Sequence, residues 1–131
     1  MPQEIEPRYL APDRAAYRRL LRLDALGPYT LTPQGWQRVR DWYLDTADGA
    51  LARQGWSCRL RREDGLRRTV TLKGPAEAEG PHTSRAEYEE VLGCMATDPA
   101  DWPAGELRAL LMGLTGGAPL KRVALLRQRR Y

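Results

Sequence analysis

Charged and uncharged residues alternate along several short segments of this 131-residue chain. Because successive side chains of a β-strand point to opposite faces, each such segment predicts a strand with one ionic face. The recurrence of this pattern indicates a closed or nearly closed β-barrel with a charged lumen. The alternative is an ordinary half-buried sheet whose ionic face meets water. The segments are Glu4-Ile5-Glu6-Pro7-Arg8, Arg59-Leu60-Arg61, Thr69-Val70-Thr71-Leu72-Lys73, Arg85-Ala86-Glu87-Tyr88-Glu89 and Arg127-Gln128-Arg129.

The other elements follow from helical spacing and turn residues. Asp13 is a candidate N-cap for a helix that ends at Leu23, and Asp64-Gly65 is a hairpin turn between two strands. This organisation predicts a single α+β domain over residues 1–131, dominated by antiparallel strands. The sequence predicts strands over 3–10, 36–45, 56–63, 66–74, 84–92 and 120–131, helical segments over 13–23, 49–54 and 99–114, and a mobile loop over 75–83.

Composition limits the class of protein. Apolar residues make up 42% of the chain and charged residues 29%, which is typical of a globular protein and excludes wholesale disorder. No apolar run is long enough to cross a bilayer, and the N-terminus lacks the basic and apolar regions of a signal peptide. We therefore expect a cytoplasmic protein. The net charge of +4, carried mostly by arginine, favours an anionic partner, because the guanidinium fork matches phosphate oxygens.

Three residue types give structural predictions. Cys58 and Cys94 lie far apart without a C-x-x-C spacing, so both are expected to be buried, reduced thiols rather than zinc ligands. His82 lies in the predicted mobile loop and is expected to be solvated. The tryptophans are expected to pack in the core or on the barrel exterior rather than to stack on bases; they are Trp36, Trp42, Trp56 and Trp102.

The ionic faces carry two pairs of carboxylates at i and i+2 spacing, Glu4 with Glu6 and Glu87 with Glu89. If their strands face each other across a lumen, these carboxylates repel one another unless a cation lies between them. A hard divalent ion such as Mg²⁺ or Mn²⁺ suits such oxygen ligands. The alternative is a set of cross-strand salt bridges on a wet sheet face. The lumen cations predict an oxyanion chain such as a triphosphate as ligand; they are Arg59, Arg61, Lys73, Arg85, Arg127 and Arg129.

The N-terminal segment Glu4-Ile5-Glu6-Pro7-Arg8 resembles the E-x-E-x-K signature of the CYTH superfamily, the triphosphate tunnel metalloenzymes. The resemblance continues in the expected order through nearly the whole chain. Its further motifs are Asp41-Trp42-Tyr43-Leu44-Asp45-Thr46, Leu51-Ala52-Arg53-Gln54-Gly55-Trp56, Arg59-Leu60-Arg61-Arg62-Glu63, Thr71-Leu72-Lys73-Gly74-Pro75 and Ser84-Arg85-Ala86-Glu87-Tyr88-Glu89.

The resemblance implies an eight-stranded antiparallel tunnel that binds a triphosphate together with a divalent metal. It implies that Glu4 and Glu6 are catalytic carboxylates that bind the metal with Glu87 and Glu89. It also implies that the triphosphate is held by inward cations, which are Arg8 at the signature lysine, Arg59, Arg61, Lys73, Arg85, and Arg127 with Arg129 on the K-x-R strand.

Two features depart from the family pattern. Arg8 replaces the signature lysine and follows Pro7, which removes one ladder donor from the first strand. The chain stops at Tyr131, directly after its sixth predicted strand, so a tunnel that is incomplete at the C-terminus is expected. Unpaired strand edges then predict a homo-oligomer that associates through them.

The expected activity is metal-dependent hydrolysis of a triphosphate, with inorganic triphosphate as the first candidate. A non-catalytic polyphosphate- or nucleotide-binding module is the alternative from another class, and an adenylate cyclase of the same family is a further one. An RNA-binding basic sheet is the weakest alternative and nucleic acid is not expected as a partner, because the chain has no RNP-like aromatic motif and acidic pairs on the same face would repel a nucleic-acid backbone.

Overall fold

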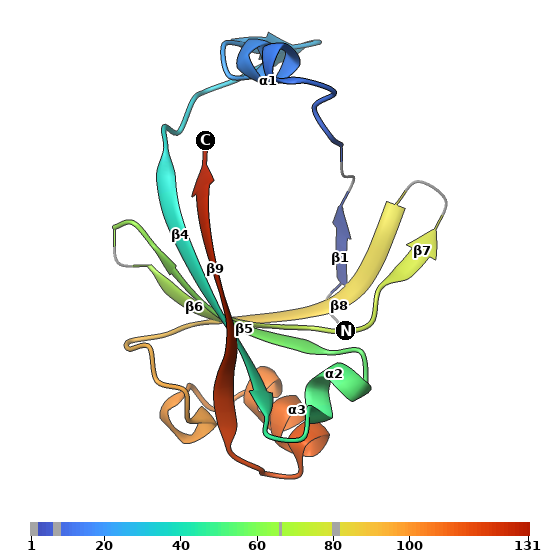
Figure 1. The fold of residues 1–131 in the computed structure, drawn as a ribbon, viewed down its shortest axis with the longest axis vertical. Coiled ribbons are helices and arrows are strands. Elements are labelled where there is room, and N and C mark those ends of the chain that lie inside the picture. The colour runs from blue at the N-terminus through green and yellow to red at the C-terminus, as the bar shows by residue number, and fades with distance from the viewer. Residues whose placement is uncertain (1–2, 7–8, 66, 80–81) are drawn as a thin grey trace.

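The computed structural model describes residues 3–6, 9–65, 67–79 and 82–131, without the side chains of Glu6, Glu79, His82 and Thr83. Its main feature is one antiparallel sheet in the order β1-β8-β6-β5-β4-β9, in which β7 also pairs with β8. The sheet curves so that β4 and β9 lie on one side and β1 and β8 on the other (Figure 1). The strands are β1 (Gln3–Glu6), β4 (Gln37–Thr46), β5 (Ser57–Glu63), β6 (Arg68–Lys73), β7 (Glu77–Glu79), β8 (His82–Val91) and β9 (Leu120–Arg130).

The predicted α+β class with an incompletely closed antiparallel sheet is confirmed. β1 and β9 are the two edge strands, and they do not pair with each other within the described part of the chain. The long strands begin and end within about two residues of their predicted bounds, because alternating side chains and the Asp64-Gly65 turn fix them locally. β1 is shorter than predicted, and Arg8 falls outside the described residues.

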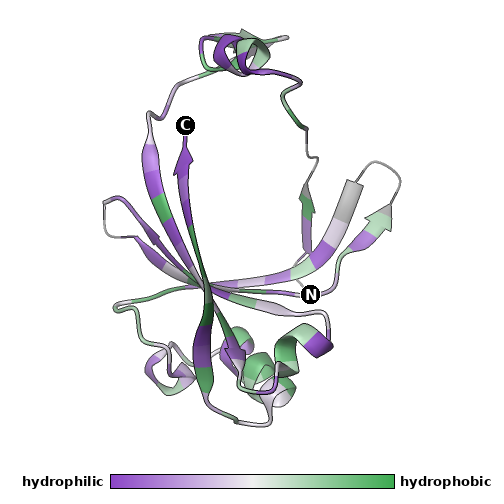
Figure 2. Ribbon diagram, viewed as in Figure 1, coloured by the Kyte–Doolittle hydropathy of each residue, from purple (hydrophilic) through white to green (hydrophobic). Residues whose placement is uncertain are grey.

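One face of the sheet carries apolar residues where the helices α2 (Ala50–Arg53) and α3 (Glu106–Thr115) cover it, and arginines further along the same strands. Figure 2 shows these helices as mainly hydrophobic and the upper parts of β4 and β9 as mainly hydrophilic. Leu60 and Leu72 from the sheet are fully buried with Leu111 from α3. Burying one such side chain stabilises the fold by about 1.5–3 kcal/mol, so this layer holds the other face of the sheet in place.

The predicted helix over 99–114 is split into two. Pro99–Asp101 forms a 3₁₀ turn, and α3 begins only at Glu106. Pro103 lacks a backbone donor and Gly105 has an extended backbone, so a continuous helix cannot pass through this stretch. The helix ends as predicted at Gly116, whose φ of +62° favours glycine.

The segment between β1 and β4 forms a small separate layer. Asp13 caps α1 (Arg14–Leu20) as predicted, accepting a hydrogen bond from the backbone N of Ala16. A short hairpin of β2 (Ala25–Leu26) and β3 (Tyr29–Thr30), which the sequence did not predict, follows it. Figure 1 shows α1 at the top of the view, apart from the strands of the main sheet.

The prediction of a mobile loop over 75–83 is wrong in part, because this stretch contains β7 and the start of β8. β7 pairs with the first residues of β8, with Glu77 opposite Ser84. β7 lies on the side of β8 opposite β1, where it continues the line of β6 along β8.

β4 and β9 pair along their whole length with one irregularity. Tyr43 lies opposite Ala124, whereas the next β4 residue, Leu44, lies opposite Arg122. Val123 is therefore an additional residue in β9, a β-bulge. Beyond it, the even-numbered residues of β9 share the face of Asp41 and Tyr43.

No helix in the described part of the chain has the length and apolar content that a membrane span requires.

Candidate functional site

The polar face of the sheet contains a hollow of about 250 Å³. Neighbouring strands contribute to it at registered positions, since Tyr43 lies opposite Arg59, Arg59 opposite Thr71, and Lys73 opposite Glu87. The shared face follows from these pairs, because directly opposed residues of antiparallel strands project on the same side. The lining residues are Tyr43, Ser57, Arg59, Thr71, Lys73 and Arg85.

Lys73 joins three strands at one end of this hollow. Its Nζ donates a hydrogen bond to Glu4 Oε2 on β1 and lies 3.9 Å from Glu87 Oε1 on β8. Arg85 lies opposite Glu4 in the β1–β8 ladder. The structure therefore brings together four of the residues that the sequence predicted for the site.

The two carboxyl groups beside Lys73 are shifted in opposite directions. Burial alone would raise the pKa of Glu4, but the hydrogen bond and charge of Lys73, helped by Arg85, hold it below its usual value. Burial raises the pKa of Glu87, and repulsion from Glu4 and Glu89 adds to the rise against the attraction of Lys73. The two carboxyl groups also act on each other, and this interaction lowers the pKa of Glu4 and raises that of Glu87. A further cation beside Glu87 would oppose the rise in its pKa, because a nearby positive charge favours the ionised form.

Arg59 reaches Glu89 through a hydroxyl group. Its Nη2 donates to Thr71 Oγ1 at 3.3 Å, and Thr71 Oγ1 donates to Glu89 Oε2 at 3.2 Å. The Nε of Arg59 is buried, lies 4.0 Å from Asp41 Oδ1 and has no hydrogen-bond partner within the described residues. Arg59 also lines the hollow, so its guanidinium charge lies beside a ligand bound there.

Arg61, two residues further along β5, is engaged differently. Its Nε and Nη2 donate to Asp41 Oδ1 and Oδ2 at 2.7 and 2.8 Å, and the Asp41 side chain is fully buried. Gln128 on β9 donates to the same carboxylate at 3.2 Å. The hydrogen bond with Asp41 raises the pKa of Arg61 against the effect of burial. The structure places Arg61 in this ion pair and not among the residues that line the hollow.

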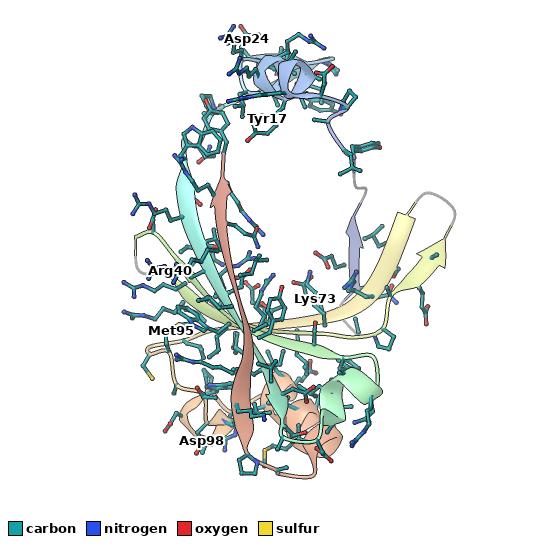
Figure 3. All side chains as sticks on the ribbon, viewed as in Figure 1. Tyr17, Asp24, Arg40, Lys73, Met95 and Asp98 are labelled. Atoms are coloured by element: carbon teal, nitrogen blue, oxygen red, sulfur yellow. The ribbon has the colours of Figure 1, made fainter. Side chains whose placement is uncertain are left out.

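The expectation that Arg127 and Arg129 share the face of Arg59 is wrong. Arg127 lies opposite Arg40 and Arg129 opposite Arg38, on the face that carries Trp42. Arg40 and Lys73, labelled in Figure 3, lie on different sides of the sheet. The bulge in β9 explains the difference, since uninterrupted alternation from Arg122 would have turned Arg127 and Arg129 to the hollow.

Two predicted residues lie outside the described part. Glu6 occupies the β1 position opposite Thr83, but its side chain is not among those described, and Arg8 is not described at all. Among the described side chains, no group of three or more His, Cys, Asp or Glu residues is arranged to hold a metal ion.

Sequence reasoning did not assign Tyr43, Thr71 or Asp41 to the site. Tyr43 and Thr71 line the hollow, and Asp41 on β4 holds Arg61. For the two β4 residues the available signal was alternation, since Asp41 and Tyr43 share one face of the strand and Trp42 lies on the other. The sequence did not show which of these faces met the charged strands.

Comparison with known proteins identifies the family. The model of the CYTH domain matches residues 2–131. The chain belongs to the CYTH domain family. No curated protein matches the sequence.

Solved structures agree with this CYTH fold. A candidate adenylyl cyclase from Hippeastrum, described as having a dominant triphosphatase activity, is 19% identical with a TM-score of 0.71, over 92% of this chain and 61% of that one. A candidate adenylate cyclase from Bacillus halodurans is 21% identical with a TM-score of 0.61, over 98% and 63%. A third, from Vibrio parahaemolyticus, is 16% identical with a TM-score of 0.56, over 98% and 60%. This CYTH chain thus spans about three fifths of the length of each of them.

Proposed function

We propose that this CYTH domain binds a triphosphate in the cationic hollow and hydrolyses it with a divalent metal, inorganic triphosphate being the first candidate. The observation that carries the proposal is the convergence of Arg59, Lys73 and Arg85 on one hollow, with the carboxyls of Glu4 and Glu87 at its end. Cations from three strands suit an anion with charge spread along a chain.

Each lining residue has a role in this proposal. The guanidinium of Arg59 binds a phosphate oxygen, and the Thr71–Glu89 link keeps it in place. Lys73 and Arg85 neutralise charge on the other phosphates, and the Tyr43 hydroxyl supplies a neutral donor. Arg61 acts through its pair with Asp41, which holds β4 and β5 in register.

The carboxylates suit a hard divalent cation. Glu4 and Glu87 both lie beside Lys73, and carboxylate oxygens of this kind are the ligands that Mg²⁺ or Mn²⁺ prefers. We assign the metal to Glu4, Glu6, Glu87 and Glu89, with Glu4 and Glu6 as the catalytic carboxylates. When bound, the metal would neutralise charge that develops on the phosphoryl oxygens.

The test is phosphate release from inorganic triphosphate, ATP and thiamine triphosphate, each with Mg²⁺, Mn²⁺ or EDTA. The hydrolase predicts release that needs metal and that falls strongly in Glu4→Gln. Arg18→Gln on the distant α1 removes a charge outside the site and should retain full activity. Formation of cyclic nucleotide and pyrophosphate from ATP would instead identify a cyclase.

A binding module without turnover is the second candidate. It is favoured by the direct contact of Lys73 with Glu4, which occupies a proposed metal ligand with an ammonium group. Calorimetric binding of triphosphate that is unaffected by EDTA, with no phosphate release under any condition, would support it over the hydrolase.

A further inference from the structure

A row of four arginines crosses the outer face of the sheet, on the side opposite the hollow. Arg127 on β9 lies opposite Arg40 on β4, Arg40 opposite Arg62 on β5, and Arg62 opposite Arg68 on β6. Neighbouring strands lie about 4.8 Å apart, so the row extends over about 14 Å. A second row begins with Arg38 opposite Arg129.

The arginines of this surface, which we call the arginine row, have few acidic neighbours. The outward positions of β4, β5, β6 and β9 in the described chain carry no carboxylate. Glu63 and Asp64 border a shallow hollow of about 110 Å³ with Arg38, Arg40 and Arg62, and Glu90 on β8 lies on the same face opposite Val70. The Asp64 carboxylate accepts a hydrogen bond from the backbone N of Arg38 at 2.8 Å.

Like charges directly opposite one another destabilise a sheet, and here they recur across three successive strand pairs. No ion pair involves Arg38, Arg40, Arg62 or Arg127 within the described residues. A polyanion laid across the strands would turn this repulsion into attraction, with release of its counterions.

Aromatic rings lie on the same face beside the arginines. Trp36 is 46% exposed and Tyr131 48%, and their ring centroids are 5.2 Å apart. The guanidinium of Arg129 lies 5.1 Å from the Trp36 ring, and that of Arg122 lies 5.3 Å from Trp42. Exposed rings next to backbone-binding cations are the features that hold single-stranded nucleic acid, whose bases stack while its phosphates meet arginine.

We propose that the arginine row with Trp36 and Tyr131 binds single-stranded nucleic acid. The expectation against such a partner assumed that acidic pairs shared the face of the cations, and the register removes that objection for the outer face. The aromatic rings favour a strand with unpaired bases over a plain polyphosphate, and contacts of the arginines with its phosphates predict binding without sequence preference.

The test is fluorescence anisotropy of a labelled uridine 12-mer at several salt concentrations. Arg40→Gln/Arg62→Gln is expected to lower the slope of log affinity against log salt by about 1.4, at about 0.7 for each lost phosphate contact. Arg18→Gln/Arg19→Gln removes the same charge from α1 and is the matched control. Equal losses in the two double variants, or no binding by the original protein, would overturn the proposal.

Base stacking is tested separately, by the affinity of variants that lack an aromatic ring. Trp36→Leu should weaken binding about tenfold without changing the salt slope. Tyr131→Leu is the second variant, because the last residue after β9 can change without loss of the fold. If a polyphosphate of equal charge competes as well as the oligonucleotide, or if neither aromatic change has an effect, then the ligand is not a nucleic acid. Preferential binding to anionic lipid vesicles would also contradict the proposal.

The two anion sites are distinguishable. Arg59→Gln should impair triphosphate binding while oligonucleotide binding persists, and Arg40→Gln/Arg62→Gln should do the reverse. Loss of both ligands in both variants would mean that only one anion site exists.

Discussion

At the scale of single residues, two arginines of one motif have different environments. Arg59 lines the hollow with an unpartnered Nε, whereas Arg61 is bound on two nitrogens to the buried Asp41. Removing one partner of a buried pair leaves an uncompensated charge. The two side chains should therefore respond differently to truncation.

We expect Arg61→Ala to lower the free energy of unfolding by about 3–5 kcal/mol, measured by urea denaturation. Arg59→Ala should change it little but weaken triphosphate binding by about 1–3 kcal/mol in calorimetry. The double variant Asp41→Asn/Arg61→Gln removes both charges and should be more stable than Arg61→Ala. Equal stability losses from Arg59→Ala and Arg61→Ala would contradict this division.

The two cysteines also differ in their environment, since Cys58 is buried and Cys94 is exposed. Burial, with a smaller effect of the Asp45 charge, raises the pKa of the Cys58 thiol to about 12. Cys94 is exposed, so the expectation that both thiols are buried is wrong for it. We predict that Ellman's reagent modifies one thiol in the folded protein and two in urea. Cys94→Ser should abolish the fast reaction, and a fast reaction that remains in this variant would show that Cys58 is accessible.

The sequence could predict which residue types gather at the site but not how they pair. Alternation alone indicated a common face for Glu4, Lys73, Arg85 and Glu87, as the registers confirm. Asp41 is hydrogen-bonded to Arg61 while Arg59 Nε stays 4.0 Å from it, and this difference depends on the β4–β5 register, in which Asp41 lies directly opposite Arg61. Such a long-range pairing has no local signature.

At the scale of elements, Lys73 connects β1 to β6 and β8 through the two carboxyl groups. Because the pKa of Glu4 is lower in the fold, its ionisation stabilises the protein above the unfolded pKa, and this stability is lost as pH falls through the folded pKa. Glu87 has a raised pKa, so its ionisation costs stability at neutral pH, and the cost disappears as pH falls.

We therefore predict that, without metal at neutral pH, Glu4→Gln lowers the melting temperature and Glu87→Gln raises it slightly. The Glu87→Gln difference should shrink as pH is lowered toward about 4, near the ordinary pKa of these groups, and the Glu4→Gln difference should shrink only below it. Added Mg²⁺ with triphosphate should stabilise the original protein more than Glu87→Gln, because bound ligands stabilise only the folded state. A Glu87→Gln protein that is less stable at neutral pH would contradict the assignment.

Elements with strong local signals were predictable, and elements set by tertiary packing were not. β4, β5 and β9 have long alternation, and the β5–β6 turn has Asp64-Gly65. The two-residue strands β2 and β3 are too short to show a period, and β7 is a strand only because β8 lies beside it.

At the scale of the whole molecule, the edge strands β1 and β9 are the surfaces through which a second copy could add a strand to the sheet. β9 pairs with β4 on one side and, within the described residues, with no strand on the other. Its side chains Val123, Leu125 and Leu126 are each about half exposed, from 44% to 52%. A long unpaired edge with apolar side chains is a template for another strand.

We predict self-association through these edges at micromolar concentration, measured by light scattering. Leu125→Lys places a charge on the outer face of β9 and should shift the equilibrium toward monomer. Met112→Lys, on the exposed side of α3, is the matched control and should leave it unchanged. A monomer at all concentrations would exclude edge pairing.

The bulge at Val123 determines which β9 side chains face the hollow. Because side chains alternate along a strand, the insertion or deletion of one residue at this position would move every following β9 side chain to the opposite face of the sheet. No substitution of one side chain could transfer Arg127 and Arg129 together from the outer surface to the hollow. Deletion of residue 123 would therefore move both arginines to the face of the hollow in one step and remove them from the outer face.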